Sequence, residues 1–379
     1  MGNSDSKLAL KQGIFKLSAS EPITLNDPYW RGFYELPNTP DDIFSLFTST
    51  DIRRARDSSL KNIETLICTL TERLSWLRQH RSFPQPDLAP EKHALNCIRV
   101  LTRILPYIYE DEKLDGWEEA LFWEKRRRKK TGGKAEILFD DTKTQTHDDA
   151  QHSEYEDVRP LGEDLIDNLI DLLFLVGFTI PSSERSRSRV TYAIWQRGVG
   201  CTTTMHATKE MESNRVEVLR LLLTLTSKSL YLPAHILPNK GVRALTYLTA
   251  YPDKQIVLSL LCSHLNTVLN YNPAAWRVPY DHMVYKDPKQ LLVTYALDFL
   301  LAILLYPIPE DVKSHTAKNN FRHFLGRLHR LQDFEFLSGS MIRTLNQPVS
   351  RRGILADRLS HIRISFKQAI PICQGARSL

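Results

Sequence analysis

The chain has 379 residues, of which 42% are hydrophobic and 25% are charged, and its formal net charge is +6. This is the composition of an ordinary soluble protein that is long enough to bury a sizeable core, as two or three domains or as one extended array. The mild positive charge favours an anionic membrane surface, but it does not single out a nucleic-acid-binding protein.

Five cysteines are scattered through the chain without a Cys-x-x-Cys pair, and three of them lie in strongly apolar stretches. This pattern is typical of reduced, buried thiols in a cytosolic protein. The N-terminus has no apolar segment of the secretory type, and the chain has no Asn-x-Ser/Thr sequon, which agrees with a cytosolic location.

The first eight residues contain the pattern of an N-myristoylation substrate. Removal of Met1 would expose the amine of Gly2, and Ser6 stands where such substrates favour a serine or threonine, followed by the basic Lys7. The alternative is a frayed polar terminus whose glycine has no role. Because one myristoyl chain gives only marginal, reversible membrane binding, stable residence on a membrane needs a second signal.

Helical periodicity begins after an irregular lead-in. Residues 22–40 are rich in Pro, Asn, Asp and aromatic side chains, which predicts an irregular packed segment. Apolar residues then recur at three- and four-residue steps in 60–77 and again in 90–108, which predicts two amphipathic helices. The short Pro-rich link at 81–87 suggests that these two helices form a hairpin.

The composition changes between residues 125 and 157, where six basic residues precede two glycines and a polar, acidic tract. Few of these residues can be buried, so we expect a disordered loop between helices. The basic run is compatible with a nuclear localisation signal, with a solvated loop, or with a patch attracted to anionic lipid that would supply the second membrane signal. Its members are Lys125, Arg126, Arg127, Arg128, Lys129 and Lys130.

Helical periodicity resumes at residue 160 and continues in four later segments, without convincing strand alternation. These segments are 214–232, 253–270, 288–306 and 318–337. The pattern predicts an all-α, HEAT- or armadillo-like helical solenoid, in which successive helix pairs bury their apolar faces and leave an extended surface for partners.

The stretch 291–308 is almost wholly apolar apart from Asp298. Such a segment is either a transmembrane helix or a helix buried between the layers of an array. The charged residue near its centre and its marginal length favour the buried helix.

No established constellation of catalytic or metal-binding residues emerges from the sequence. It contains no nucleotide-binding, metalloprotease or serine-hydrolase motif. His93 and Cys97 share a helix face, but no third orienting group accompanies them, and a packed cysteine beside a histidine is the commoner arrangement. Other Cys/His and His/His pairs lack the further ligands that zinc requires. We therefore expect no catalytic residue, cofactor, metal or small-molecule substrate.

Seven blocks of sequence occur in the order found in one protein family: 1–8, 95–111, 159–161 leading into 171–174, 192–200, 231–233, 265–268 and 278–282. On these blocks the chain resembles the high-temperature-induced dauer-formation protein family, relatives of dymeclin. The resemblance implies a cytosolic protein held on the cytosolic face of Golgi membranes through a myristoylated Gly2. It also implies a role in vesicle trafficking and protein sorting at the trans-Golgi, through unidentified protein partners rather than catalysis.

A rival hypothesis is a soluble helical-repeat adaptor. In that case the basic run and the Arg/Ser stretch at 182–189 would carry a nuclear localisation signal or a nucleic-acid contact, although no RNA-binding fold signal supports the contact.

The organisation expected from these observations has three parts. A myristoylated N-terminal segment occupies 1–20, a HEAT-like array occupies 21–348 around the loop at 125–157, and a divergent tail occupies 349–379. Members of the family are longer, so the tail is a true short terminus, a spliced form or a truncated gene model. An array cut within its repeats would expose an apolar face and lose solubility.

Overall fold

The computed structural model describes residues 3–129, 137–139, 155–182, 188–233, 235–271, 288–309 and 318–346. The chain divides into two compact units. Unit 1 is formed by Met1–Thr191, Glu217–Leu248 and Pro309–Asp311, and unit 2 by Tyr192–Val216, Thr249–Ile308 and Val312–Leu379. The predicted all-α class is confirmed, and the succession of packed helices agrees with a solenoid-like fold.

Unit 1 contains most of the helices and a small sheet. Its elements are α1 (Asn3–Lys16), η1 (Pro28–Arg31), α2 (Gly32–Glu35), α3 (Pro40–Leu46), α4 (Ser49–Ser58), α5 (Leu60–Gln79), α6 (Glu91–Tyr109), η2 (Glu112–Leu114), α7 (Asp115–Trp123), β1 (Arg126–Lys129), β2 (Ile137–Phe139), β3 (Tyr155–Val158), α8 (Leu161–Leu173), η4 (Ser227–Leu230), α10 (Leu237–Lys240) and α11 (Arg243–Thr249), with the part of α9 (Lys209–Thr226) that follows Val216.

Helices α5 and α6 form the centre of unit 1. Helix α5 packs against α6 and α8, and α6 also packs against α2 and α3. The apolar side chains that recur along α5, such as Ile63, Leu66 and Leu70, are fully buried, as are Ile98 and Leu101 of α6. The helices predicted at 60–77 and 90–108 are therefore confirmed, because their spacing places one apolar stripe toward the core.

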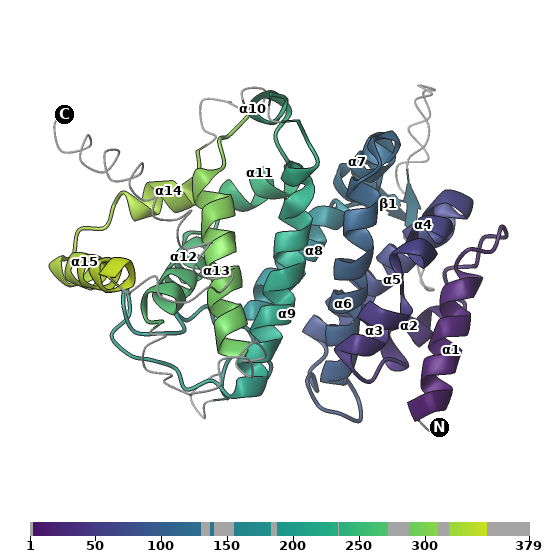
Figure 1. Ribbon diagram of the computed structural model, residues 1–379, viewed down its shortest axis with the longest axis horizontal. Helices are drawn as coiled ribbons and strands as arrows, with labels where there is room; N and C mark the ends of the chain where they lie inside the picture. Colours follow the sequence, from purple (N-terminus) through teal and green to yellow (C-terminus); the bar gives the residue numbers. More distant parts are fainter. Residues whose placement is uncertain are drawn as a thin grey trace. The chain divides into compact units, whose positions relative to one another are not determined.

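Most of the N-terminal segment predicted at 1–20 forms a packed helix, α1. Helix α1 packs against α2, α3 and α4 (Figure 1). Its Leu10 and Ile14, together with the following Leu17, are almost completely buried. These three residues lie at four- and three-residue steps, a spacing that is typical of one face of an amphipathic helix.

The segment 125–157, expected to be a disordered loop, instead contains strands at its described positions. Strand β1 lies in the middle of a three-stranded antiparallel sheet, between β2 and β3. Arg126 is the register partner of Phe139 on one side and of Val158 on the other. The backbone N–H and C=O groups of β1 form hydrogen bonds with β3, about thirty residues later in the sequence. The polar composition of this segment predicted exposure, because a pairing between strands so far apart leaves no local sequence signal.

Unit 2 is built on α12 (Lys254–Leu269) and α13 (Pro288–Leu305), which pack against each other, with α14 (Asn320–Leu325) and α15 (Leu331–Asn346) against α12. The helices predicted at 253–270 and 288–306 match α12 and α13. The single helix predicted at 318–337 is wrong, because two helices occupy this stretch. Helix α14 starts after its N-cap Asn319 and ends at Gly326, and α15 begins at Leu331.

Helix α13 is the one described helix that is long and apolar enough to cross a membrane. Within unit 2 it packs against α12 and α14. Seven of its side chains are buried there, among them Leu292, Phe299 and Ile303. These contacts agree with the helix between layers predicted for 291–308, but only 39% of α13 is buried and Leu305 is exposed, so the choice between a buried and a membrane-spanning helix stays a prediction.

Two blocks of the family resemblance meet in unit 2. The Asn266 side chain of α12 accepts a hydrogen bond from the backbone N–H of Val199 (2.8 Å) and donates to the carbonyl oxygens of Gln196 (2.9 Å) and Val199 (3.1 Å). Gly198, in the middle of this loop, has φ +149°, and a Cβ there would lie 2.5 Å from Asn266 Oδ1 and 2.6 Å from the ring of Phe336. The blocks at 192–200 and 265–268 are therefore parts of one structural clamp.

Replacing Gly198 should break this clamp. For Gly198→Ala we expect a loss of about 2–4 kcal/mol of stability in unit 2, because alanine is strained at this φ and its methyl group overlaps Asn266. Hydrogen exchange of the α12 amides measures the loss. The control is Gly339→Ala on α15, where no atom lies within 4 Å of the added Cβ. Equal exchange in the two variants would show that the clamp does not stabilise α12.

Candidate functional site

Two buried aspartates, one in α3 and one in α4, hold the N-terminal helix α1 in place. Thr39 and Asp42 form a capping box at the start of α3, and Thr48 and Asp51 form a second one at the start of α4. Each aspartate also binds a lysine of α1. Lys7 Nζ lies 3.2 Å from Asp42, and Lys11 Nζ lies 2.6 Å from Asp51.

The spacing of the two lysines places both on the side of α1 that faces α3 and α4. Lys7 and Lys11 are four residues apart, so they lie on the same side of α1, one turn from each other. Lys11 Nζ also donates to the carbonyl oxygen of Leu46 (2.8 Å). The pairs therefore fix both the rotation and the height of α1 on α3 and α4.

Both carboxylates are held in the charged form. Burial alone would raise the pKa of Asp51, but hydrogen bonds from Lys11 and Thr48 outweigh it and hold the pKa below its ordinary value. At Asp42 burial also raises the pKa, but hydrogen bonds from the backbone of Asn38 and Thr39 and the interaction with Lys7 outweigh it, so the pKa of Asp42 is lowered as well. Because both pKa values are lowered in the folded state, this stabilisation is present at neutral pH and is lost as the pH falls through them.

A buried asparagine holds the chain that leaves α1. Asn62 of α5 is fully buried; it accepts a hydrogen bond from the N–H of Ile23 (2.9 Å) and donates to the carbonyl oxygens of Leu17 (3.3 Å) and Ala19 (3.2 Å). Helix α1 is thus fixed along its length by Asp42 and Asp51 and at its C-terminal end by α5.

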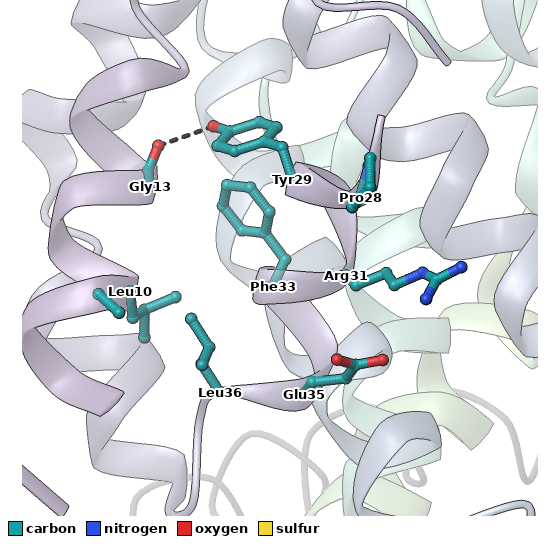
Figure 2. Close-up of a pocket in the computed structure, with 10 residues that line it drawn as sticks. Leu10, Gly13, Pro28, Tyr29, Arg31, Phe33, Glu35 and Leu36 are labelled. Atoms are coloured by element: carbon teal, nitrogen blue, oxygen red, sulfur yellow. Dashed lines mark hydrogen bonds between the residues drawn. The ribbon is translucent and has the colours of Figure 1, made fainter. Parts of the chain in front are cut away.

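A pocket of about 440 Å³ lies between α1 and the η1–α2 turn (Figure 2). Leu10, Phe33 and Leu36 supply apolar walls, and the Tyr29 hydroxyl donates a hydrogen bond to the carbonyl oxygen of Gly13 (2.7 Å). Burial, and then the nearby charge of Asp27, raise the pKa of Tyr29, so this hydroxyl stays neutral and acts as a tie between the two elements. None of the described residues that line the pocket is a Cys, His or Ser.

The structure places the predicted membrane-proximal residues at different kinds of position. Gly2 and Lys130 lie outside the described residues, and Lys125 is exposed. Lys7 is about half exposed and pairs with Asp42. Arg127, Arg128 and Lys129 belong to β1 through their backbone pairing with β3.

Arg126 does not belong to an exposed basic patch. Its side chain is 4% exposed, and Nη2 lies 2.6 Å from Asp164 and 2.7 Å from the carbonyl oxygen of Arg159. Arg126, predicted as a membrane-proximal basic residue, therefore has a buried side chain that is already paired within unit 1. A run of charged residues is exposed only on average. The Arg126 guanidinium is buried because it pairs with Asp164 of α8, 38 residues later in the sequence.

The pair His93 and Cys97 has no catalytic geometry. Cys97 is fully buried, and burial raises the pKa of its thiol, so the reactive thiolate is disfavoured. His93 Nδ1 lies 3.0 Å from Nη2 of Arg73, and burial and that charge lower the pKa of His93 to about 4. Among the described residues, no group of three or more His, Cys, Asp or Glu side chains is arranged to hold a metal ion.

These observations define a helical-array protein whose N-terminal helix is docked by ion pairs. A protein-family profile described as Hid1, high-temperature-induced dauer-formation protein, matches residues 1–372. The chain therefore belongs to the high-temperature-induced dauer-formation protein family. Membership in this family fits a trafficking-related protein.

Curated relatives extend beyond the chain. The Ubp5-interacting protein ftp105 of Schizosaccharomyces pombe is 30% identical over 438 residues, which covers 98% of this chain and 47% of the relative. Protein HID1 of Homo sapiens is 29% identical over 379 residues, which covers 92% of this chain and 45% of the relative. The chain thus spans about half the length of these relatives. No solved structure matches it.

The docking of α1 can be tested at Asp51. Asp51→Asn should weaken the docking by about 1–2 kcal/mol, because the amide cannot pair with Lys11, and hydrogen exchange of the α1 amides should become roughly 5–30-fold faster. The control is Asp57→Asn, whose carboxylate is exposed and pairs with Arg56 rather than with α1. If both variants leave α1 exchange unchanged, the ion pairs do not hold the helix.

Proposed function

We propose that the chain is an N-myristoylated peripheral protein on the cytosolic face of Golgi and trans-Golgi membranes, where it acts as a scaffold in vesicle trafficking and protein sorting. The observation that carries the proposal is the combination of family membership over residues 1–372 with the Gly2 and Ser6 pattern directly before a docked helix. A lipid on Gly2 would be joined to unit 1 through α1, not through a long free linker.

In this proposal the protein works by surface recognition through a HEAT-like array and carries out no reaction. The name of the fission-yeast relative records an interaction with the protein Ubp5, which favours a role in binding proteins. Successive packed helices supply such an extended surface. Trafficking proteins and the membrane are then the partners, without a cofactor or a small-molecule substrate.

The rival hypothesis of a nuclear or nucleic-acid-associated adaptor receives less support. It relied on the basic run at 125–130, and the side chain of Arg126 in that run is used inside unit 1. A localisation signal is read as an extended, accessible segment, whereas β1 pairs with β2 and β3 through its backbone.

The anchor can be tested by localisation in the cells of origin. Gly2→Ala removes the acceptor amine for the acyl chain, so we expect the variant to move from a trans-Golgi marker to a diffuse cytosolic distribution in fluorescence microscopy. The matched control is Gly116→Ala in α7, where no atom lies within 4 Å of the added Cβ. Golgi localisation of Gly2→Ala equal to that of the control would remove the lipid from the mechanism.

A further inference from the structure

The outward side of α1 exposes two large apolar side chains. Leu8 is 61% exposed and Phe15 is 51% exposed. They are seven residues apart, close to two helical turns, so they lie on the same side of the helix. Leu10 and Ile14 on the opposite side are buried in unit 1. Helix α1 is therefore apolar on the side that packs and again on the side that does not.

Two cations hold the Phe15 ring in its outward position. Lys11 Nζ lies 5.0 Å from the ring centroid, and the Arg54 guanidinium lies 4.9 Å from it. Asp51 binds both cations, with a distance of 2.8 Å to Arg54 Nη2. The same carboxylate that docks α1 therefore also positions the groups around its exposed aromatic ring.

Near α1 the positively charged side chains are more exposed than the aspartates with which they pair. The side chains of Lys7 and Arg54 are 46% and 43% exposed, whereas those of Asp42 and Asp51 are 3% and 6% exposed. Lys16 is exposed as well, with Nζ 5.0 Å from the centroid of the Tyr29 ring. Beside the two apolar side chains the surface therefore presents Lys7, Lys16 and Arg54, with the carboxylates that pair with Lys7 and Arg54 buried beneath them; the exposed Asp5 in the first turn of α1 adds one negative charge.

We propose that this α1 outer face, formed by Leu8 and Phe15 with the exposed side chains of Lys7, Lys16 and Arg54, docks on an anionic lipid surface. Leu8 and Phe15 would enter the boundary between headgroups and acyl chains, and the cations would contact anionic headgroups. The inference rests on the proposed function, because it supplies the second signal that one acyl chain on Gly2 requires. It replaces Arg126, which is buried, as a membrane determinant.

Charge complementarity selects the lipid surface over an apolar protein groove. A groove on a partner protein would cover Leu8 and Phe15 by shape, and it would not need exposed cations beside them. Long basic side chains, in contrast, can keep their charges at headgroup level while the apolar residues between them are inserted.

The test uses the full chain, myristoylated by co-expression with an N-myristoyltransferase. Its sedimentation is measured with vesicles of phosphatidylcholine alone and with vesicles that also contain phosphatidylserine. The test variant is Leu8→Gln/Phe15→Gln. The control is Leu88→Gln/Leu230→Gln, which replaces two leucines of unit 1 that are 62% and 83% exposed and lie outside α1. All four side chains are exposed, so unchanged urea midpoints are expected and confirm that the variants fold.

We expect at least a tenfold loss of partitioning onto phosphatidylserine vesicles for Leu8→Gln/Phe15→Gln, no loss for the control, and weaker binding of the parent protein to phosphatidylcholine alone. If the test variant binds like the parent while Gly2→Ala does not bind, the outer face is refuted and the lipid anchor stands. If Gly2→Ala binds like the parent while the test variant does not, the face stands and the anchor fails. If the myristoylated parent binds neither vesicle, the outer face is not a lipid site, and a protein partner becomes its occupant.

Discussion

The N-terminal layer depends on two aspartates that each serve two helices. Asp42 and Asp51 cap α3 and α4 and at the same time bind Lys7 and Lys11 of α1. A buried carboxylate is costly unless it is paired and hydrogen-bonded. The capping box and Lys11 provide both for Asp51, whereas at Asp42 the backbone N–H groups bind Oδ2 and Oδ1 has only the ion pair with Lys7. The position of α1 therefore follows from the need to satisfy two buried charges.

This constraint connects the fold to the proposed function. Once Lys7 and Lys11 face α3 and α4, the geometry of the helix turns Leu8 and Phe15 away from the core. In the proposal, the residue that carries the acyl chain directly precedes α1 in the sequence and lies six residues before Leu8. In the proposal, two weak membrane determinants this close in sequence would act together, because the first contact would hold the second close to the surface.

Much of the fold could be predicted from local periodicity, and the rest depended on contacts distant in sequence. Leu66 and Leu101 lie in long apolar stripes, which identify α5 and α6 without tertiary information. The burial of Arg126 depends on Asp164, and no local pattern reports such a partner. For the site, the sequence pointed to Gly2 and Lys7 but missed Leu8, Phe15 and the two aspartates. The paired Thr-x-x-Asp boxes at 39–42 and 48–51 were visible signals for α3 and α4.

The proposed lipid before α1 can be tested by the intact mass of the protein purified from its own cells. We expect Met1 to be absent and a myristoyl group to be attached to the amine of Gly2. Fragmentation of the N-terminal peptide would place the added mass on that residue. A free or merely acetylated amine at Gly2 would contradict the account, since α1 would then present its apolar and basic residues without an anchor.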